Sequence, residues 1–303
     1  MHDCLIAFGS NQGNRLEVLQ NAVKYMADQE GISIVATSRP YRTLPVGGPS
    51  DQEPYLNAAI RIETLLNPSE VHQILIKTET HFGRLRPTGS RWGSRKIDLD
   101  LLLFDQRQLK TPELTVPHPR MSFRRFVLEP ACEIANEMIH VPSGRTLGQL
   151  VSHLEERENL VLCFCEPDSA FPNEPVGSEL ERLDVDSNWE VRLITDSEQM
   201  RQSWSDAKLV TYFEHQSVSS TSGQSDGNES RFTESDAEEK NNDRSFWSEM
   251  VSFPGPTLAL PRQMTKAKVE IFAAIEAMGP LQGNALDAGG LEQSQDPEHE
   301  VLP

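Results

Sequence analysis

The sequence lacks the features that mark membrane, secreted and disulfide-stabilised proteins. None of its apolar runs approaches the roughly 20 residues that cross a bilayer, and its N-terminus has no basic segment followed by an apolar core and a cleavage site. The four cysteines, Cys4, Cys132, Cys163 and Cys165, form no CxxC pair. These absences predict a cytoplasmic protein with no membrane partner, whose cysteines stay reduced and serve packing.

The common glycine-rich phosphate motifs are also missing. The chain contains neither GxxxxGK(S/T) nor GxGxxG, so it is not a P-loop kinase. The one stretch that superficially resembles a phosphate cradle, residues 9–13 (GSNQG), is interpreted as a tight turn between a strand and a helix. Any phosphate chemistry in this chain must therefore use another kind of site.

Negative charge is concentrated in one half of the chain. The formal net charge is -18, and residues 1–158 contain 18 Lys/Arg and 19 Asp/Glu, whereas residues 159–303 contain 10 and 27. An acidic extension of this kind repels nucleic acid and anionic membranes. We therefore expect two regions with different roles, and no nucleic-acid partner.

Residues 1–158 carry the pattern of two strand-helix-strand units. Strands are predicted at residues 4–8, 32–36, 55–64 and 97–104, and helices at residues 16–26 and 68–82. Asn67 and Pro68 provide a cap and a first-turn proline for the second helix. This order predicts an α+β domain of the ferredoxin-like βαββαβ class, a mostly antiparallel sheet with helices on one face.

The pattern weakens beyond residue 158. Short strands are predicted at residues 160–164, 190–194 and 208–213, and a helix at residues 265–278. We expect residues 159–215 and 245–278 to form a small α/β accessory domain. Residues 216–244, rich in Ser, Asp, Glu and Asn, and residues 279–303 are expected to be disordered.

Two carboxylates in the last predicted strand are the strongest chemical signal. Asp98 and Asp100 alternate with apolar residues, so their side chains lie on the same face about 7 Å apart. Such a pair suits Mg²⁺, which takes one or two carboxylates and completes its shell with phosphate oxygens and water. An exposed strand face that happens to be acidic is the alternative interpretation.

A basic loop leads directly into that strand. It contains Arg84, Arg86, Arg91, Arg95 and Lys96. Cations beside a carboxylate metal site favour polyphosphate transfer, because the charge on the phosphate oxygens must be neutralised. A solvated face or a nucleic-acid patch remains the alternative, although only one aromatic residue, Trp92, lies among these arginines.

Four blocks between residues 5 and 135 carry a family resemblance. They are LIAFGSNQGN, YRTLPVGGPSDQEPYLNAAIRIET, HFGRLRPTGSRWGSRKIDLDLLLF and LTVPHPRMSFRRFVLEPACEIA. In order and spacing they resemble the successive signatures of the 6-hydroxymethyl-7,8-dihydropterin pyrophosphokinases. The resemblance implies transfer of the pyrophosphoryl group of MgATP to the pterin hydroxymethyl group, with release of AMP, in tetrahydrofolate biosynthesis. It covers about the first half of the chain and nothing after it.

The resemblance also implies a role for individual residues. Asp98 and Asp100 resemble the ligands of two Mg²⁺ ions, with Arg84 and Arg95 completing the catalytic set. The ATP contacts that it implies are Glu79, Arg84, Trp92, Arg95, Thr115, His118 and Arg124. The pterin pocket that it implies consists of Thr43, Val46, Tyr55, Asn57 and Phe126, in which the two aromatic rings sandwich the flat heterocycle.

A different class of function stays open at this point. The same fold can serve as a catalytically weak nucleotide- or pterin-binding module, whose acidic C-terminal extension binds a protein partner. Formation of AMP and of a pyrophosphorylated pterin distinguishes the enzyme from the binding module.

Overall fold

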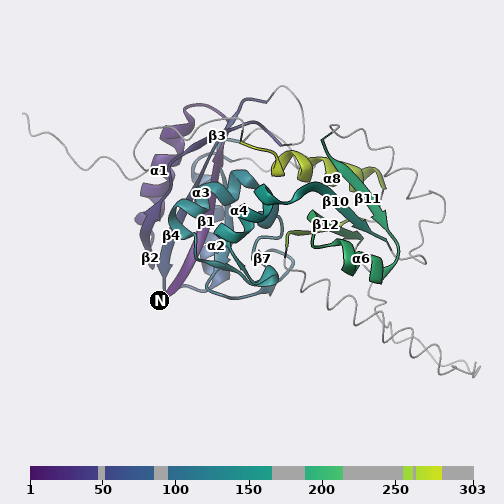
Figure 1. Cartoon of the computed structure of the whole chain (residues 1–303). Helices are drawn as coiled ribbons and strands as arrows, with labels where there is room; N and C mark the ends of the chain where they lie inside the picture. The colour runs from purple at the N-terminus through teal and green to yellow at the C-terminus, as the bar shows by residue number, and fades with distance from the viewer. Residues whose placement is uncertain (47–51, 85–94, 166–187, 214–254, 262–263, 282–303) are drawn as a thin grey trace, which may run out of the picture. The chain divides into compact units, whose positions relative to one another are not determined.

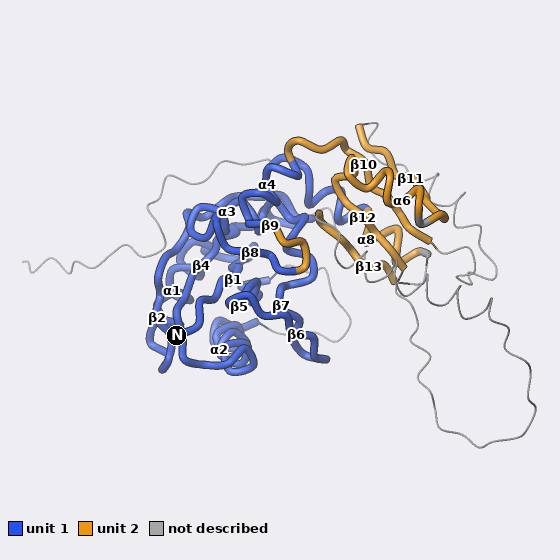
Figure 2. The backbone as a smooth tube through the Cα atoms, turned by 60° about the horizontal axis from the view of Figure 1, so that its bottom comes forward, with its two compact units in different colours: residues 1–141, 145–154, 272–303 blue, residues 142–144, 155–271 orange. Residues whose placement is uncertain are grey.

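The computed structural model describes the chain except residues 47–51, 85–94, 166–187, 214–254, 262–263 and 282–303. The chain separates into two compact units (Figure 2). The first comprises Met1–Val141, Arg145–Leu154 and Phe272–Pro303, and the second comprises Pro142–Gly144 and Glu155–Ile271. The predicted disordered segment 216–244 lies outside the described residues, as does all of 279–303 beyond residue 281.

The helices and strands before residue 157 belong to the first unit, except that Pro142–Gly144 and residues 155–156 are counted with the second (Figure 1). In chain order they are β1 (His2–Ser10), α1 (Arg15–Ala27), β2 (Ile32–Thr37), β3 (Tyr41–Thr43), β4 (Tyr55–Thr64), α2 (Pro68–His81), β5 (Asp98–Phe104), β6 (Leu109–Lys110), β7 (Thr115–Val116), η1 (Met121–Phe123), α3 (Arg125–Ala135), β8 (Ile139–His140), η2 (Val141–Ser143), β9 (Arg145–Thr146) and α4 (Leu147–Glu156). The strands and helices predicted before residue 105 are all present.

An antiparallel sheet with the order β2-β4-β1-β5 forms the centre of this unit. Strand β1 pairs with β4 along its whole length and with β5 from Cys4 to Gly9. The other edge of β4 pairs with β2 at its C-terminal end and with the short β3 at its N-terminal end. The antiparallel character predicted from the sequence is confirmed. Because β1 lies between β4 and β5, residues near its end adjoin the starts of both neighbours.

Helices cover both faces of this sheet, and the prediction that they lie on one face is wrong. On one face, α1 and α2 pack on a buried cluster that includes Ile6, Phe8 and Ile60. On the other face, α3 packs against β1, β3 and β4. The reason is that residues such as Leu5 and Ala59, which alternate with that cluster, are also apolar and fully buried, so their face needs a cover as well.

A bulge interrupts the pairing of β1 with β5. Leu5 pairs with Leu103 while Ile6 pairs with Leu101, which leaves Leu102 opposite no residue of β1. The backbone carbonyl of Leu102 instead accepts a hydrogen bond from the backbone N–H of His118 at 2.9 Å. The bulge therefore fixes the segment that follows β7 beside the second half of β5.

The start of α2 shows why this helix could be predicted. The side chain of Asn67 accepts hydrogen bonds from the backbone N–H groups of Ser69 and Glu70, and the Glu70 carboxylate accepts one from Asn67 at 2.7 Å. This reciprocal capping box, with Pro68 in the first turn, satisfies N–H groups that have no partner within the helix.

The second unit contains a parallel sheet. Its elements are β10 (Glu158–Phe164), β11 (Glu190–Ile194), α6 (Ser197–Ser203), β12 (Ala207–Phe213), β13 (Thr257–Leu260) and α8 (Met264–Met278), of which the end of α8 is counted with the first unit. The sheet order is β11-β10-β12-β13, and all three pairings are parallel. The three strands and the helix predicted in this region are present, whereas β13 and α6 were missed.

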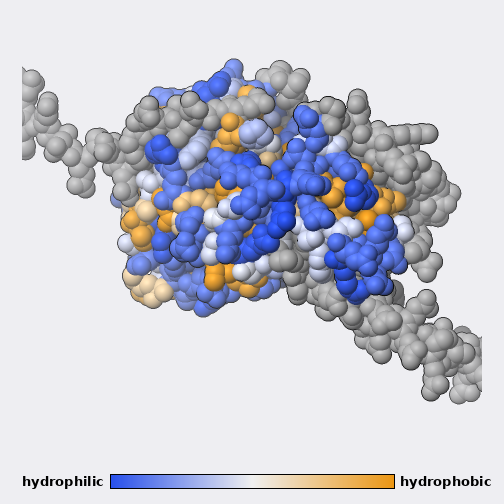
Figure 3. Space-filling model, in the orientation of Figure 1, coloured by the Kyte–Doolittle hydropathy of each residue, from blue (hydrophilic) through white to orange (hydrophobic). Residues whose placement is uncertain are grey.

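The visible surface is mainly hydrophilic, with small separated hydrophobic patches (Figure 3). Within the described ranges, the large hydrophobic residues that are most exposed are Met1, Val35, Leu44, Leu65 and Val269. Among the helices that the structure describes, none has the length and apolar character of a membrane span.

Burial of His140 predicts a loss of stability in acid. Burial lowers the pKa of His140 from its ordinary value of 6.5 to about 4. Below pH 6.5 the unfolded chain therefore takes up a proton that the folded chain does not, which favours unfolding. We expect this group to lower the free energy of unfolding by about 3 kcal/mol between pH 7 and pH 4. Urea unfolding of wild type and His140→Gln across this range checks it, and equal pH dependence in the two proteins would contradict it.

Candidate active site

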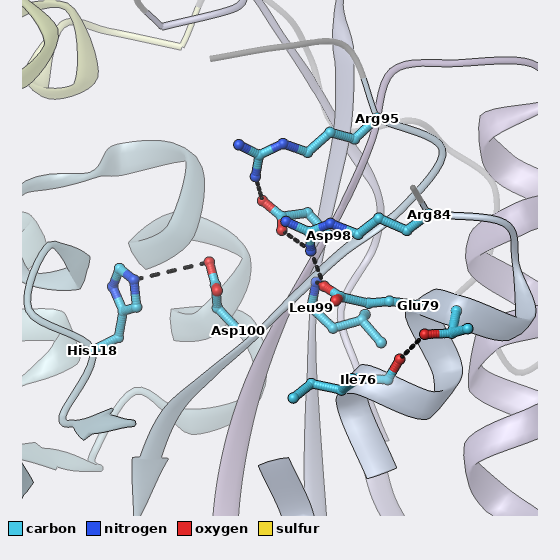
Figure 4. Close-up of polar contacts among 9 residues, drawn as sticks. Ile76, Glu79, Arg84, Arg95, Asp98, Leu99, Asp100 and His118 are labelled. Atoms are coloured by element: carbon cyan, nitrogen blue, oxygen red, sulfur yellow. Dashed lines mark hydrogen bonds and ion pairs between the residues drawn. The ribbon is translucent and has the colours of Figure 1, made fainter. Parts of the chain in front are cut away.

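Strand β5 presents Asp98 and Asp100 on one face of the sheet, as the sequence predicts (Figure 4). Across the strand pair, Asp98 is opposite Gly9 and Asp100 is opposite Ala7. Leu99, between them, belongs to the buried cluster on the other face. The alternation of a strand therefore places both carboxylates on the same side.

The Asp98 carboxylate is held by two arginines. Its Oδ1 lies 2.5 Å from Arg84 Nη1, and its Oδ2 lies 2.6 Å from Arg95 Nη1. Figure 4 shows the two guanidinium groups converging on Asp98 from the ends of the segment that joins α2 to β5. Two of the cations expected beside the carboxylates, Arg84 and Arg95, are thus in direct contact with one of them, whereas Arg86 and Arg91 lie outside the described residues.

Glu79 contacts both Arg84 and the backbone of β5. Its side chain is almost fully buried, its Oε1 accepts a hydrogen bond from the backbone N–H of Leu99 at 2.9 Å, and the same oxygen pairs with Arg84. Burial alone would lower the pKa of Arg84, but Asp98, Glu79 and Asp100 together raise it above its ordinary value. Glu79 therefore joins the end of α2, Arg84 and the start of β5 in one charged network.

Asp100 is the more accessible of the two carboxylates. Its side chain is 42% exposed, and its Oδ2 lies 3.9 Å from His118 Nε2. Burial, followed by the nearby Arg124 and Arg120, lowers the pKa of His118 from 6.5 to about 3, although Asp98 acts in the opposite direction. The backbone N–H of Arg120 donates to His118 Nδ1 at 3.3 Å, so the neutral ring carries its proton on Nε2. His118 thus offers an N–H donor beside Asp100.

Three of the five residues predicted for the pterin pocket, Thr43, Tyr55 and Asn57, lie close together at the start of β4. Asn57 pairs with Tyr41 of β3, and Tyr55 pairs with Thr43. Asn57 Nδ2 donates to Thr43 Oγ1 at 2.8 Å within the interior. This bond orients the Asn57 amide, whose Oδ1 is turned toward Gly9. Burial raises the pKa of Tyr55, so its hydroxyl stays protonated.

The remaining predicted site residues come from the segment between β7 and α3. Thr115 lies in β7, which is adjacent to β5, and Phe126 lies in the first turn of α3, which packs against β3 and β4. The Arg124 guanidinium carbon lies 5.5 Å from the centre of the Phe126 ring. Val46 is half-buried in the loop after β3, and Trp92 lies outside the described residues.

Asn11 is a site residue that the sequence interpretation missed. Its side-chain Oδ1 accepts a hydrogen bond from the backbone N–H of Arg95 at 2.7 Å, and its own N–H donates to the Arg95 carbonyl at 3.1 Å. Asn11 Nδ2 also donates to the Glu53 carbonyl at 3.2 Å. The turn after β1 therefore anchors both Arg95 and the segment before Tyr55. A polar residue directly after a predicted glycine turn was the available signal.

The donors at this site suit a metal that also binds phosphate. In the part of the chain that the structure describes, no group of three or more His, Cys, Asp or Glu side chains is arranged to hold a metal ion. Two carboxylates on one strand face, one of them exposed, instead match Mg²⁺, which commonly takes one or two carboxylates and completes its shell with phosphate oxygens and water. The arginine pairs on Asp98 show that this carboxylate already attracts cations.

Comparison with known proteins identifies the family. Residues 5–136 match the family described as 7,8-dihydro-6-hydroxymethylpterin-pyrophosphokinase. The 2-amino-4-hydroxy-6-hydroxymethyldihydropteridine pyrophosphokinase of Synechocystis is 38% identical over 154 residues, which cover 51% of this chain and 77% of that protein. The chain belongs to this family.

Other relatives with the same name match a similar part of the chain. The protein of Bacillus subtilis is 42% identical over 133 residues, 44% of this chain and 78% of its own length. That of Haemophilus influenzae is 36% identical over 157 residues, 52% of this chain and 96% of its own length. A crystal structure of "HPPK-DHPS in complex with substrates" is 13% identical with a TM-score of 0.39, and the match covers 70% of this chain and 57% of that one. Such a distant structural likeness adds nothing to the family assignment.

Replacement of Glu79 tests the buried network. Glu79→Gln keeps the shape and an acceptor for the Leu99 N–H, but it removes the negative charge that faces Arg84. We expect a loss of about 1–3 kcal/mol in the free energy of unfolding, because a buried cation loses one of its partners. Urea unfolding measures this loss. The exposed Glu30→Gln is the control and should change stability by less than about 0.5 kcal/mol; equal effects of the two substitutions would rule out the network.

Proposed function

We propose that this chain transfers the pyrophosphoryl group of MgATP to the hydroxymethyl oxygen of 6-hydroxymethyl-7,8-dihydropterin, yielding the pterin diphosphate and AMP in tetrahydrofolate biosynthesis. One observation carries the proposal: Asp98 lies on β5 to one side of β1, and Tyr55 and Asn57 lie on β4 to its other side. Arg84 and Arg95 contact the Asp98 carboxylate. This arrangement suits a polyphosphate on one side and a flat amide-bearing ring on the other. Family membership supports the same reaction.

The bond changes of this reaction are simple. The hydroxymethyl oxygen forms a bond to the β-phosphorus of ATP, the bond from that phosphorus to the oxygen bridging to the α-phosphorus breaks, and the hydroxyl proton is released. AMP leaves with the bridging oxygen. Because negative charge accumulates on this leaving oxygen, catalysis depends on cations and on alignment of the two substrates.

Asp98 and Asp100 are proposed to hold two Mg²⁺ ions. Bound to both carboxylates and to the phosphates, the ions would supply neutralisation of the phosphate charge. The Asp100 side chain is exposed and lies 3.9 Å from His118 Nε2, so it can bind a metal ion from the solvent side. Asp98 can do so only if its two arginines release it.

This requirement gives the arginines two positions. In the structure, Arg84 and Arg95 neutralise Asp98. We propose that both arginines leave Asp98 and bind the phosphate oxygens when the nucleotide binds, since guanidinium groups bind phosphate and carboxylate in the same bidentate manner. Glu79 remains on Arg84 through this change and limits how far it moves.

The other nucleotide contacts are proposed from the family resemblance. They comprise Glu79, Trp92, Thr115, His118 and Arg124 together with Arg84 and Arg95. The position of His118 supports its part in this set, because its Nε2–H lies beside Asp100 and can donate to a phosphate oxygen.

The pterin is proposed to bind between Tyr55 and Phe126, with Thr43, Val46 and Asn57 at its amide edge. The hydrogen bond from Asn57 Nδ2 to Thr43 Oγ1 supports this assignment, because it leaves Asn57 Oδ1 to accept a hydrogen bond from an N–H group of the pterin ring. Tyr55 and Phe126 come from β4 and from α3, which pack against each other, so one ring is available from each side.

The order β2-β4-β1-β5 with helices after β1 and β4 supports assignment of the first unit to the ferredoxin-like class. We assign the pyrophosphokinase domain to residues 1–158 and an accessory role to residues 159–303, whose acidic character suits a protein partner. A weak binding module would instead bind both substrates without forming AMP.

Removal of either aspartate tests the reaction. The purified chain is incubated with MgATP and 6-hydroxymethyl-7,8-dihydropterin, and AMP and pterin diphosphate are measured by chromatography. We expect Asp98→Asn and Asp100→Asn to lower kcat at least a hundredfold with an unchanged fold, because each loses a charged metal ligand. The exposed Asp28→Asn is the control. Near-normal turnover in either variant would disprove the metal assignment, and absence of AMP from wild type would favour the binding module.

Removal of residues 159–303, which include the end of α8 that is counted with the first unit, tests the division of labour. All the proposed catalytic and binding residues lie within residues 1–126, so a chain of residues 1–158 should form AMP at a rate within twofold of the full chain. Thermal unfolding of the two chains shows whether the truncation changes stability independently of activity. A drop in kcat of more than tenfold at unchanged folding would assign the extension a part in catalysis.

A further inference from the structure

Gly9 occupies an unfavourable place for a glycine. It lies near the end of β1, the strand flanked by both β4 and β5, and it is buried. Glycine within a strand costs roughly 0.5–1 kcal/mol relative to alanine. Glycines whose backbone requires a positive φ include Gly13, Gly31, Gly83 and Gly144, but not Gly9. The backbone conformation therefore gives no reason for glycine here, and the reason must lie in the space beside it.

That space is bordered by residues from both halves of the site. Gly9 pairs with Asn57 on β4 and with Asp98 on β5, so a side chain at Gly9 would point to the same face as theirs. A Cβ atom at Gly9 would lie 2.9 Å from Asn57 Oδ1, 3.8 Å from Tyr55 Cδ1 and 3.9 Å from Asp98 Cβ. Gly9 is therefore the floor between the proposed pterin pocket and the proposed metal site.

We propose that Gly9 is a specificity-determining residue: its missing side chain keeps open the passage through which the hydroxymethyl arm of the pterin reaches the phosphate held at Asp98. The proposal rests on the proposed function, because it takes Asn57 and Tyr55 as the ring site and Asp98 as the phosphate-metal site. It goes beyond that function by assigning a determinant of acceptor access to a residue with no functional group.

The contact with Asn57 makes the position sensitive. Asn57 cannot easily turn away from a new methyl group, because its Nδ2 is fixed on Thr43 by the 2.8 Å hydrogen bond. A Cβ atom 2.9 Å from Asn57 Oδ1 is closer than van der Waals contact allows, so the amide must shift or lose that bond. Alanine at residue 9 would thus disturb the ring-binding amide and narrow the passage at the same time.

The same change should leave nucleotide binding almost intact. The Cβ of Asp98 would lie at 3.9 Å from the new methyl carbon, an ordinary contact distance. The Asp98 carboxylate is held by Arg84 and Arg95, and neither arginine is among the three nearest contacts of the new atom. A selective effect on the pterin therefore separates this role from a general packing role.

Calorimetric titration of the full chain tests the proposal. The probe is 6-hydroxymethylpterin, titrated in the presence of Mg²⁺ and saturating α,β-methylene-ATP, which cannot be cleaved at the bond that the reaction breaks. We expect Gly9→Ala to raise the Kd of the pterin at least tenfold, to change the Kd of the nucleotide analogue less than twofold, and to lower the melting temperature less than Phe8→Leu does. The control is Phe8→Leu, a change on the same strand but on the opposite face, which α1 and α2 cover. It should lower the melting temperature and leave the affinities for pterin and nucleotide within twofold of the wild-type values.

Three results would overturn the role of Gly9. They are an unchanged pterin Kd in Gly9→Ala, an equal loss of affinity for pterin and nucleotide, and a fall of the melting temperature like that of Phe8→Leu. A failure of the proposed function looks different, because wild type would then bind both ligands in this titration yet form no AMP from MgATP and the reduced pterin.

Discussion

The Asp98 carboxylate and the cations around it constrain the rest of this site. A carboxylate at the edge of a buried strand needs a positive partner, and here Arg84 and Arg95 supply it from the two ends of one connecting segment. Arg84 is in turn neutralised by the buried Glu79, which also accepts from the backbone of Leu99. The network therefore joins α2, the connecting segment and β5 in one electrostatic unit. The same charges that stabilise it are those that polyphosphate transfer requires.

The antiparallel sheet explains how the proposed pterin pocket and the proposed metal site come to share one floor. Strand β1 pairs with β4 on one side and with β5 on the other, so its last residues adjoin both Asn57 and Asp98. The turn after β1 then continues this role, since Asn11 binds the backbone of Arg95 and the carbonyl of Glu53. A bulge at Leu102 fixes His118 next to Asp100 by a backbone hydrogen bond. Strand pairing, the side chain of Asn11 and the backbone hydrogen bond of His118 thus position the site together.

Sequence reasoning succeeded where the signal is local and failed where it depends on tertiary contacts. The cap at Asn67, the strand at residues 55–64 and the same-face placement of Asp98 and Asp100 follow from propensity and period, and the structure contains all of them. The position of α3 on the second face of the sheet was not predicted. A helix is required there because Leu5 and Ala59 are buried on that face, and their burial is known only from the structure. Asn11 illustrates the same limit in the site, since its partners Arg95 and Glu53 are distant in sequence and no spacing rule reveals them. Glu79 was named only through the family resemblance, and its hydrogen bond from the Leu99 N–H was not predicted. In the second unit, the strands were predicted but their parallel pairing was not, because pairing partners are not encoded in the period of a single strand.

Anomalous diffraction from crystals of the full chain, grown with Mn²⁺, α,β-methylene-ATP and 6-hydroxymethylpterin, tests the metal-phosphate site most directly. Two anomalous peaks are predicted, each about 2 Å from a carboxylate oxygen of Asp98 or Asp100, with Arg84 and Arg95 turned from Asp98 to the phosphates. Peaks located away from both aspartates, or both arginines still paired with Asp98 beside a bound nucleotide, would contradict it.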